Sequence, residues 1–209
     1  MKKLKVLLGA LSMLTLGSAN AGTLVLDSFN YDPALSLAVT GASTSATDTV
    51  QSVESGALAQ YTLELTSANG QANASGNVAG VSEGILSYAE FPGADGTLEV
   101  VYSFGAGNTL DLSGFSSFYF DIITIDLVGG FKVALTLTDV DGTTTTAVYD
   151  ITSVGVFFAN LSQLVVAAPG ATLGFDFTQV VSAKAFITSS NGLGNDFSLD
   201  SVGLVPEPS

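Results

Sequence analysis

Carboxylates are the chemically active side chains that this chain has in quantity. Its 209 residues include 19 aspartates and glutamates but no histidine and no cysteine. A Ser-His-Asp triad, a Cys-His dyad and a His-ligated zinc site are therefore excluded, because each needs a residue type that is absent. Acid–base catalysis would have to rely on carboxylates, tyrosine or lysine.

Two carboxyl groups could hydrolyse a polysaccharide. Retaining glycosidases hold the two groups about 5 Å apart, and inverting ones hold them farther apart. The spacing of the glutamates selects no pair, and a chain this acidic offers many accidental pairs. We therefore expect no enzymatic activity and assign no catalytic residue, while a polysaccharide hydrolase or lyase stays a less favoured alternative. The glutamates concerned are Glu54, Glu64, Glu83, Glu90 and Glu99.

Carboxylates could also bind calcium, which prefers oxygen ligands. Asp27 in LVLDSF and Asp200 in FSLDSV lie near the two ends of the domain. Because the first and last strands of a sandwich often lie side by side, these two aspartates and Asp196 could hold a structural Ca²⁺ that pins the ends together. Asn30 and Asp32 are near enough in sequence to assist. The alternative is that the acids face solvent or cap turns, with no cofactor.

Exposed aromatic rings would indicate sugar binding, since sugars stack on tyrosine and tryptophan. The chain has no tryptophan, and its six tyrosines lie mostly inside predicted strands, where alternation turns several of them inward. Tyr31 and Tyr88 are the two that we expect to be exposed. The alternative is that they pack in the core or at its rim.

Strands would position these groups, because alternation of apolar and polar residues dominates the chain and helical periodicity is nearly absent. Many short strands between turn clusters predict an all-β fold, an antiparallel β-sandwich that is jelly-roll-like. Between two of the strands, Asp139-x-Asp141-Gly142 predicts a hairpin turn, with a partial calcium loop as the alternative. Strands are predicted at 23–29, 57–66, 84–91, 96–104, 116–126, 131–138, 143–151, 181–189 and 196–205.

Other regions are harder to interpret. Residues 41–53 and 67–82 are rich in small and polar residues and could be edge strands or loops. Residues 151–175 carry no charge, and we expect a buried strand followed by a loop, because polar residues and a Pro-Gly pair argue against a membrane helix. Residues 111–122 and 176–187 share a pattern of Asp, apolar residue, Ser or Thr and a turn position, which predicts two similar strand starts.

The N-terminus has the parts of a secretory signal peptide. Three lysines precede an apolar run, and Ala19 and Ala21 form a small-x-small site for signal peptidase. A short N-terminal anchor is the alternative, although the run is short for a bilayer. Cleavage would leave two lysines against 19 acids, a net charge of −17. Such a surface repels nucleic acid and anionic lipid, so neither is an expected partner.

The last five residues, VPEPS, resemble the start of a PEP-CTERM sorting signal. Pro206, Glu207 and Pro208 occupy its defining positions, in a chain with a signal peptide, an all-β body and no cysteine. The resemblance implies recognition by an exosortase in a bacterium that makes exopolysaccharide. In that family a transmembrane helix and an Arg-rich tail follow the motif. Because this chain stops at Ser209, we expect a truncated signal, with membrane contact only through the missing helix.

The expected organisation is a signal peptide at 1–21, a β-sandwich domain at 22–204 and the start of a sorting signal at 205–209. We expect an exported, non-enzymatic protein with a structural or interaction role at the cell surface or in the exopolysaccharide matrix of a Gram-negative bacterium. The alternative is a carbohydrate-binding module that recognises matrix polysaccharide. Two or more exposed aromatic rings would favour the module, and a smooth face of Thr, Ser and Asp would favour the structural role.

Overall fold

The computed structural model describes residues 23–30, 35–40, 45–51, 57–65, 71–76, 84–90, 94, 96–104, 108–126, 131–168, 170, 174–189 and 196–208. The predicted signal peptide, with Ala19 and Ala21, lies outside these residues. The described elements are β1 (Leu24–Asp27), β2 (Ser36–Thr40), β3 (Ser45–Gln51), β4 (Leu58–Leu65), β5 (Gln71–Gly76), β6 (Leu86–Glu90), β7 (Gly96–Ser103), β8 (Phe115–Asp126), β9 (Phe131–Asp139), β10 (Thr144–Ile151), β11 (Gly155–Asn160), the 3₁₀ turn η1 (Leu161–Gln163), β12 (Val165–Ala168), β13 (Val180–Ser189) and β14 (Asp196–Pro206).

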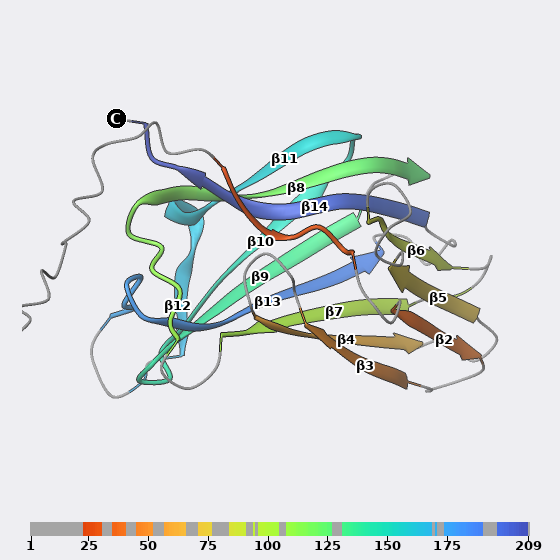
Figure 1. The fold of residues 1–209 in the computed structure, drawn as a ribbon, viewed down its shortest axis with the longest axis horizontal. Coiled ribbons are helices and arrows are strands. Elements are labelled where there is room, and N and C mark those ends of the chain that lie inside the picture. The colour runs from red at the N-terminus through yellow and green to blue at the C-terminus, as the bar shows by residue number, and fades with distance from the viewer. Residues whose placement is uncertain are drawn as a thin grey trace, which may run out of the picture.

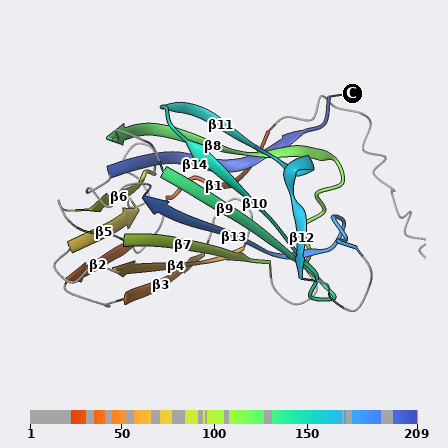
Figure 2. The same ribbon diagram turned by 180° about the vertical axis from the view of Figure 1, so that it is seen from behind.

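These strands form two antiparallel sheets that pack face to face (Figures 1 and 2). The first sheet has the order β11-β8-β14-β6-β5-β2, with β1 also paired to β14, and the second has the order β12-β10-β9-β13-β7-β4-β3. The predicted all-β antiparallel sandwich is therefore confirmed, and a strand lies in each of the nine predicted ranges. The first and last described strands are neighbours, as expected, since β1 pairs with β14.

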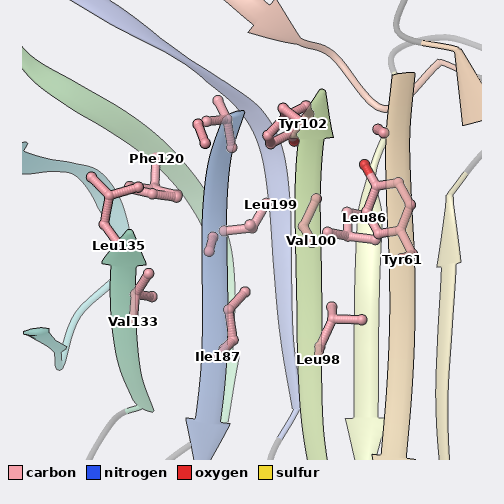
Figure 3. Close-up of a cluster of buried hydrophobic side chains, with 14 of the residues drawn as sticks. Tyr61, Leu86, Leu98, Val100, Tyr102, Phe120, Val133, Leu135, Ile187 and Leu199 are labelled. Carbon is pink, nitrogen blue, oxygen red and sulfur yellow. The ribbon is translucent and has the colours of Figure 1, made fainter. Parts of the chain in front are cut away.

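Alternation of side chains builds the core between the sheets. Along β7, Leu98, Val100 and Tyr102 are buried, while the residues between them are half-buried on the outer side. Figure 3 shows these residues meeting Leu86 and Leu199 of the first sheet. Alternating strands such as β7 therefore contribute every second side chain to a shared apolar layer, and burial of this layer is the largest favourable contribution to folding.

The hairpin turn between β9 and β10 forms as predicted. Gly142 has φ of +86°, its N–H donates to the Asp139 carbonyl over 3.1 Å, and the Asp139 N–H donates to the Thr143 carbonyl over 3.0 Å. Glycine adopts this left-handed conformation without the strain that a Cβ would add. The Asp139 carboxylate accepts hydrogen bonds from backbone N–H groups of the turn.

The uncharged region 151–175 is different from the expected buried strand and loop. It forms two strands, β11 and β12, which are the outermost strands of the two sheets and expose much of their apolar surface. An outermost strand has a neighbour on one side only, so apolar composition did not lead to burial. The sequence did not decide between strands and loops for residues 41–53 and 67–82, and these ranges contain β3 and β5. The strand β2 was not predicted.

Within the described residues, no helix has the length and apolar character that crossing a membrane requires.

Candidate functional site

Two turns of the same kind lie side by side at one end of the sandwich. The Asp111 Oδ1 accepts a hydrogen bond from the Ser113 N–H over 2.9 Å, just before β8. The Asp176 Oδ1 accepts from the Thr178 N–H over 2.9 Å and from its hydroxyl over 2.7 Å, just before β13. The predicted pair of similar strand starts is therefore confirmed, and each is an aspartate turn.

Backbone hydrogen bonds join these two turns. The Leu112 N–H donates to the Phe177 carbonyl over 2.7 Å, and Leu110 and Val180 exchange two hydrogen bonds of 2.9 and 3.1 Å. Because β8 belongs to the first sheet and β13 to the second, this pairing connects the sheets at one end of the molecule.

The turn aspartates are stabilised as anions. Hydrogen bonds from the Thr178 hydroxyl and N–H lower the pKa of Asp176 below its ordinary value. The side chain and N–H of Ser113 lower the pKa of Asp111 in the same way. Both turns therefore keep their charged acceptor at neutral pH.

A pocket of about 400 Å³ lies beside the paired turns. Its volume is within the range of small-ligand sites, roughly 300–1,000 Å³. Four apolar side chains line it, and five polar side chains provide hydroxyl, amide and carboxylate groups. The apolar group is Leu112, Phe115, Leu161 and Phe177, and the polar group is Ser113, Ser116, Asn160, Ser162 and Glu207.

The β11–η1 corner of the pocket is fixed by contacts across the sandwich. Asn160 caps η1, since its Oδ1 accepts from the Ser162 N–H over 3.0 Å and from the Ser162 hydroxyl over 2.8 Å. The Tyr149 hydroxyl of β10 donates to the Asn160 carbonyl over 2.8 Å. The rings of Tyr149 and Phe157 also pack edge to face, with their centroids 5.9 Å apart. These contacts join the second sheet to the wall of the pocket.

One residue of the predicted sorting motif, Glu207, forms another part of this wall. Pro206 ends β14 opposite Phe115 of β8. The Glu207 N–H donates to the Gly114 carbonyl over 3.0 Å, and the Ser116 hydroxyl donates to the Val205 carbonyl over 3.3 Å. Glu207 and Pro208 are exposed. Figures 1 and 2 show this C-terminal segment at the same end of the sandwich as β12.

The three aspartates proposed for calcium lie on two paired strands, Asp27 on β1 and Asp196 and Asp200 on β14. Asp27 is fully buried, and its two carboxylate oxygens accept hydrogen bonds from the Phe29 N–H and the Tyr61 and Tyr102 hydroxyls. Asp196 is exposed and accepts from the Glu90 N–H over 3.1 Å. Asp200 is half-buried, at an irregular point in the β14–β8 pairing.

Calcium binding stays a prediction after these observations. The residues that the structure describes contain no group of three acidic side chains that could hold a metal ion. The Oδ1 of Asn30, a residue suggested as an assisting ligand, is buried and accepts no hydrogen bond from the described residues. Asp32 lies outside them.

The three described glutamates among those considered for hydrolysis, Glu64, Glu90 and Glu99, are not among the residues that line the pocket. Glu99 forms an ion pair of 3.3 Å with Lys184, and Glu64 is exposed on β4. Glu90 is buried and accepts hydrogen bonds from the Gly96 N–H over 2.9 Å and from the Tyr88 hydroxyl. Glu54 and Glu83 lie outside the described residues.

The expectation that Tyr88 is exposed is wrong. Its ring is buried, stacks on Phe197 at 5.0 Å and donates its hydroxyl hydrogen to Glu90. Tyr31 lies outside the described residues. The aromatic rings at the pocket are instead phenylalanines, Phe115 and Phe177, both half-buried. Sequence reasoning missed them because a phenylalanine beside a strand is typical of a core position, although the repeated turn pattern did mark their neighbourhood.

No protein-family model matches the chain, and no curated protein sequence matches it. Among solved structures, CtCBM11 in its solution structure is 15% identical, with a TM-score of 0.52 over 92% of this chain and all of that one (100%). A family 11 carbohydrate-binding module of a Clostridium thermocellum cellulase is 16% identical, with a TM-score of 0.47 over 90% of this chain and 97% of that one. An agarase is 12% identical, with a TM-score of 0.45 over 70% of this chain and 23% of that one. The likeness to CtCBM11 shows a shared fold, which is the predicted jelly-roll-like sandwich.

Proposed function

We propose that this protein is an exported, non-catalytic β-sandwich that binds polysaccharide through the pocket at the C-terminal end of the sandwich. The observation that carries the proposal is the chemistry of the pocket wall. Phe115 and Phe177 offer aromatic surface, and Ser113, Ser116, Asn160, Ser162 and Glu207 offer hydrogen-bonding groups. A sugar ring presents an apolar C–H face and a rim of hydroxyl groups, and therefore needs both kinds of partner.

The proposed ligand is a neutral polysaccharide. The exported chain would carry a net charge of −17, and Glu207 contributes a carboxylate to the pocket itself. An anionic sugar polymer would be repelled by this field, whereas a neutral one would not. Carbohydrate is also the class of ligand that the Clostridium thermocellum structural neighbour, a carbohydrate-binding module, is named for.

Export and sorting form the cellular part of the proposal. The signal peptide would direct the chain across the inner membrane, and Pro206-Glu207-Pro208 would be the motif that an exosortase recognises, so that the protein reaches the cell surface or the exopolysaccharide matrix. The test is to append an apolar helix and an Arg-rich tail and to compare the wild type with Glu207→Ala in an exosortase-bearing host. Equal processing of both proteins would contradict the sorting role.

Titration calorimetry with soluble neutral polysaccharides tests the binding proposal. A mixed-linked β-glucan, an agarose oligosaccharide and a dextran serve as probes. We expect binding to at least one probe and at least a tenfold loss of affinity in Phe177→Ala and in Glu207→Gln. Leu58→Ala is the matched control, because Leu58 is exposed on β4 of the second sheet and does not line the pocket. Equal affinity in the wild type and both pocket variants would exclude this site.

A structural display role without a ligand is the second candidate, and the outer face of the second sheet favours it. Threonines pair across neighbouring strands on this face, Thr136 with Thr146 at 3.1 Å and Thr47 with Thr62 at 3.3 Å. Among the described residues of this polar face no aromatic ring is largely exposed, and Phe186 on β13 is half-buried. Absence of binding to every probe, with normal surface display, would support this role.

A further inference from the structure

The strand β11 is an unusual edge for an acidic protein. It is the outermost strand of the first sheet, and the side chains of Val154, Val156 and Phe158 are 57, 51 and 55% exposed. No residue from Ile151 to Phe175 carries a charge. We call the surface formed by Val154, Val156 and Phe158 the β11 edge.

Edge strands normally carry features that prevent pairing with another chain. These include lysine or proline on the edge, an inward charge, and a bulge that twists the strand away. The β11 edge has none of them: its sequence, GVFFAN, contains no charge and no proline, and its pairing with β8 is regular from Gly155–Ile122 to Asn160–Ser117. Its outer backbone groups face no further strand of the first sheet in the described part of the chain.

We propose that the β11 edge pairs with the same edge of a second copy and so forms a symmetric dimer. In an antiparallel arrangement with the two-fold axis near Val156, the row of three apolar side chains in one copy lies along the same row in the other. β-Branched and aromatic residues are favourable cross-strand neighbours. The two first sheets would join into one continuous sheet, which satisfies the outer N–H and C=O groups of both edges.

The absence of charged residues on β11 makes this edge the place where two acidic copies can meet. Two exported chains of net charge −17 repel one another, and contact over an acidic surface would bring like charges together. The β11 edge is flanked in sequence by uncharged residues only. On the same side of the sandwich, β12 exposes Val165 and Val166, which are also uncharged. A contact on this side therefore brings no charge of β11 or β12 against the second copy, and the acid opposite the edge is the half-buried Asp121 of β8, the partner of Val156.

The second copy is favoured over other occupants by the chemistry of the edge. A polysaccharide has no peptide groups to continue the sheet. A foreign protein would need a matching neutral apolar strand, whereas a second copy has one because its sequence is the same. The two proposals are tested at different residues, since none of the three residues of the β11 edge lines the pocket, while Asn160 at the end of β11 does.

Sedimentation velocity of the purified protein over a wide range of concentration tests the proposal. We expect the wild type to sediment as two chains, and Phe158→Lys and Val156→Lys to sediment as one, because each places charge in the pairing edge. The matched control is Leu58→Lys, whose parent side chain is 53% exposed on β4, and it should remain two chains. Raising the salt concentration should strengthen the wild-type dimer by screening the repulsion between acidic chains.

Three results would overturn the proposal. One is a wild type that sediments as a single chain at all concentrations and salt levels. Another is a Phe158→Lys protein that associates as strongly as the wild type. The third is dissociation by Leu58→Lys as well, which would assign the association to general surface hydrophobicity. Circular dichroism of each variant establishes that it is folded before its mass is interpreted.

Discussion

The Tyr61 hydroxyl donates a hydrogen bond of 2.9 Å to the Oδ2 of Asp27, and so links the two sheets through a carboxylate in the core. Tyr61 lies on β4 of the second sheet and Asp27 ends β1 of the first. The Tyr102 hydroxyl donates to the same oxygen over 3.0 Å, and the Phe29 N–H donates to the other over 2.8 Å. A buried carboxyl group is tolerated where such donors surround it.

Removing one donor from Asp27 is expected to destabilise the fold. Tyr61→Phe should lower the free energy of unfolding by about 1–3 kcal/mol, the usual cost of removing a hydrogen-bond partner from a buried polar group. Tyr119→Phe is the control, because Tyr119 is similarly buried and the structure gives its hydroxyl no hydrogen bond among the described residues. Urea denaturation of both variants measures the difference, and equal stabilities would contradict the role of Asp27 as an acceptor.

The same aspartate provides a test for calcium. Because three protein donors engage the Asp27 oxygens, we expect Asp27→Asn to lose the same stability in EDTA and in calcium. Thermal unfolding of the wild type and the variant in both conditions measures this. A loss that is several degrees larger in calcium would instead make Asp27 a cation ligand, as the sequence predicted, because a ligand of the native state raises its melting temperature.

Asp139 is expected to contribute more to stability than its position beside a hairpin turn suggests. Its carboxylate is buried and accepts from the N–H groups of Thr143 over 2.9 Å, Asp141 over 3.2 Å and Asp176 over 3.0 Å. Asp139→Ala removes the acceptor that these three N–H groups share, although the Thr143 N–H keeps the Asp141 Oδ1 over 2.9 Å, and should cost about 1–3 kcal/mol of stability.

The control for Asp139 is Asp150→Ala on the neighbouring strand. Asp150 is exposed and pairs with Lys132 at the surface, so its removal should change stability by less than about 1 kcal/mol. Urea denaturation compares the two. Similar losses would mean that the Asp139 hydrogen bonds contribute no more than a surface ion pair.

Acid should remove the stabilisation that Asp176 provides. Hydrogen bonds from Thr178 lower its pKa in the folded state, so its contribution is complete above the pKa of an unfolded aspartate, about 3.9, and is lost as the pH falls through the lower folded value. Asp176→Asn keeps an acceptor oxygen but does not titrate. The stability difference between wild type and variant should therefore shrink below about pH 4, as followed by urea denaturation. A difference that is independent of pH would contradict this assignment.

The sequence predicted most of the fold because alternation and turn residues are local signals. The strands with clear alternation, such as β7 and β9, were located to within a few residues. β5 reads QANASG, and its alanines and polar residues have weak strand propensity. It is nevertheless internal to the first sheet, between β6 and β2, because Ala72 and Ala74 bury their small side chains against the core.

The candidate site was only partly accessible to sequence reasoning. The repeated aspartate turns at Asp111 and Asp176 could be recognised, but the pairing of Leu112 with Phe177 depends on how two sheets meet. The burial of Tyr88 and the exposure of Phe158 likewise depend on which strands are internal and which are outermost. Composition gives the number of apolar residues in a strand, and topology decides how many of them are covered.

Gly203 on β14 is expected to tolerate no side chain. A Cβ at this position would lie 2.3 Å from the Leu24 carbonyl oxygen of β1 and 2.4 Å from the ring of Tyr119. Gly203→Ala must therefore move β1 or the tyrosine, and should cost about 1–3 kcal/mol. Gly114→Ala is the matched control, since a Cβ there meets nothing within 4 Å, and it should be neutral or stabilising by up to about 1 kcal/mol through the unfolded chain. Urea denaturation measures both changes, and hydrogen exchange at Val25, the partner of Gly203, reports whether β1 has separated. If the two alanine variants were equally stable, the close approach of β1, β14 and Tyr119 would not constrain the fold.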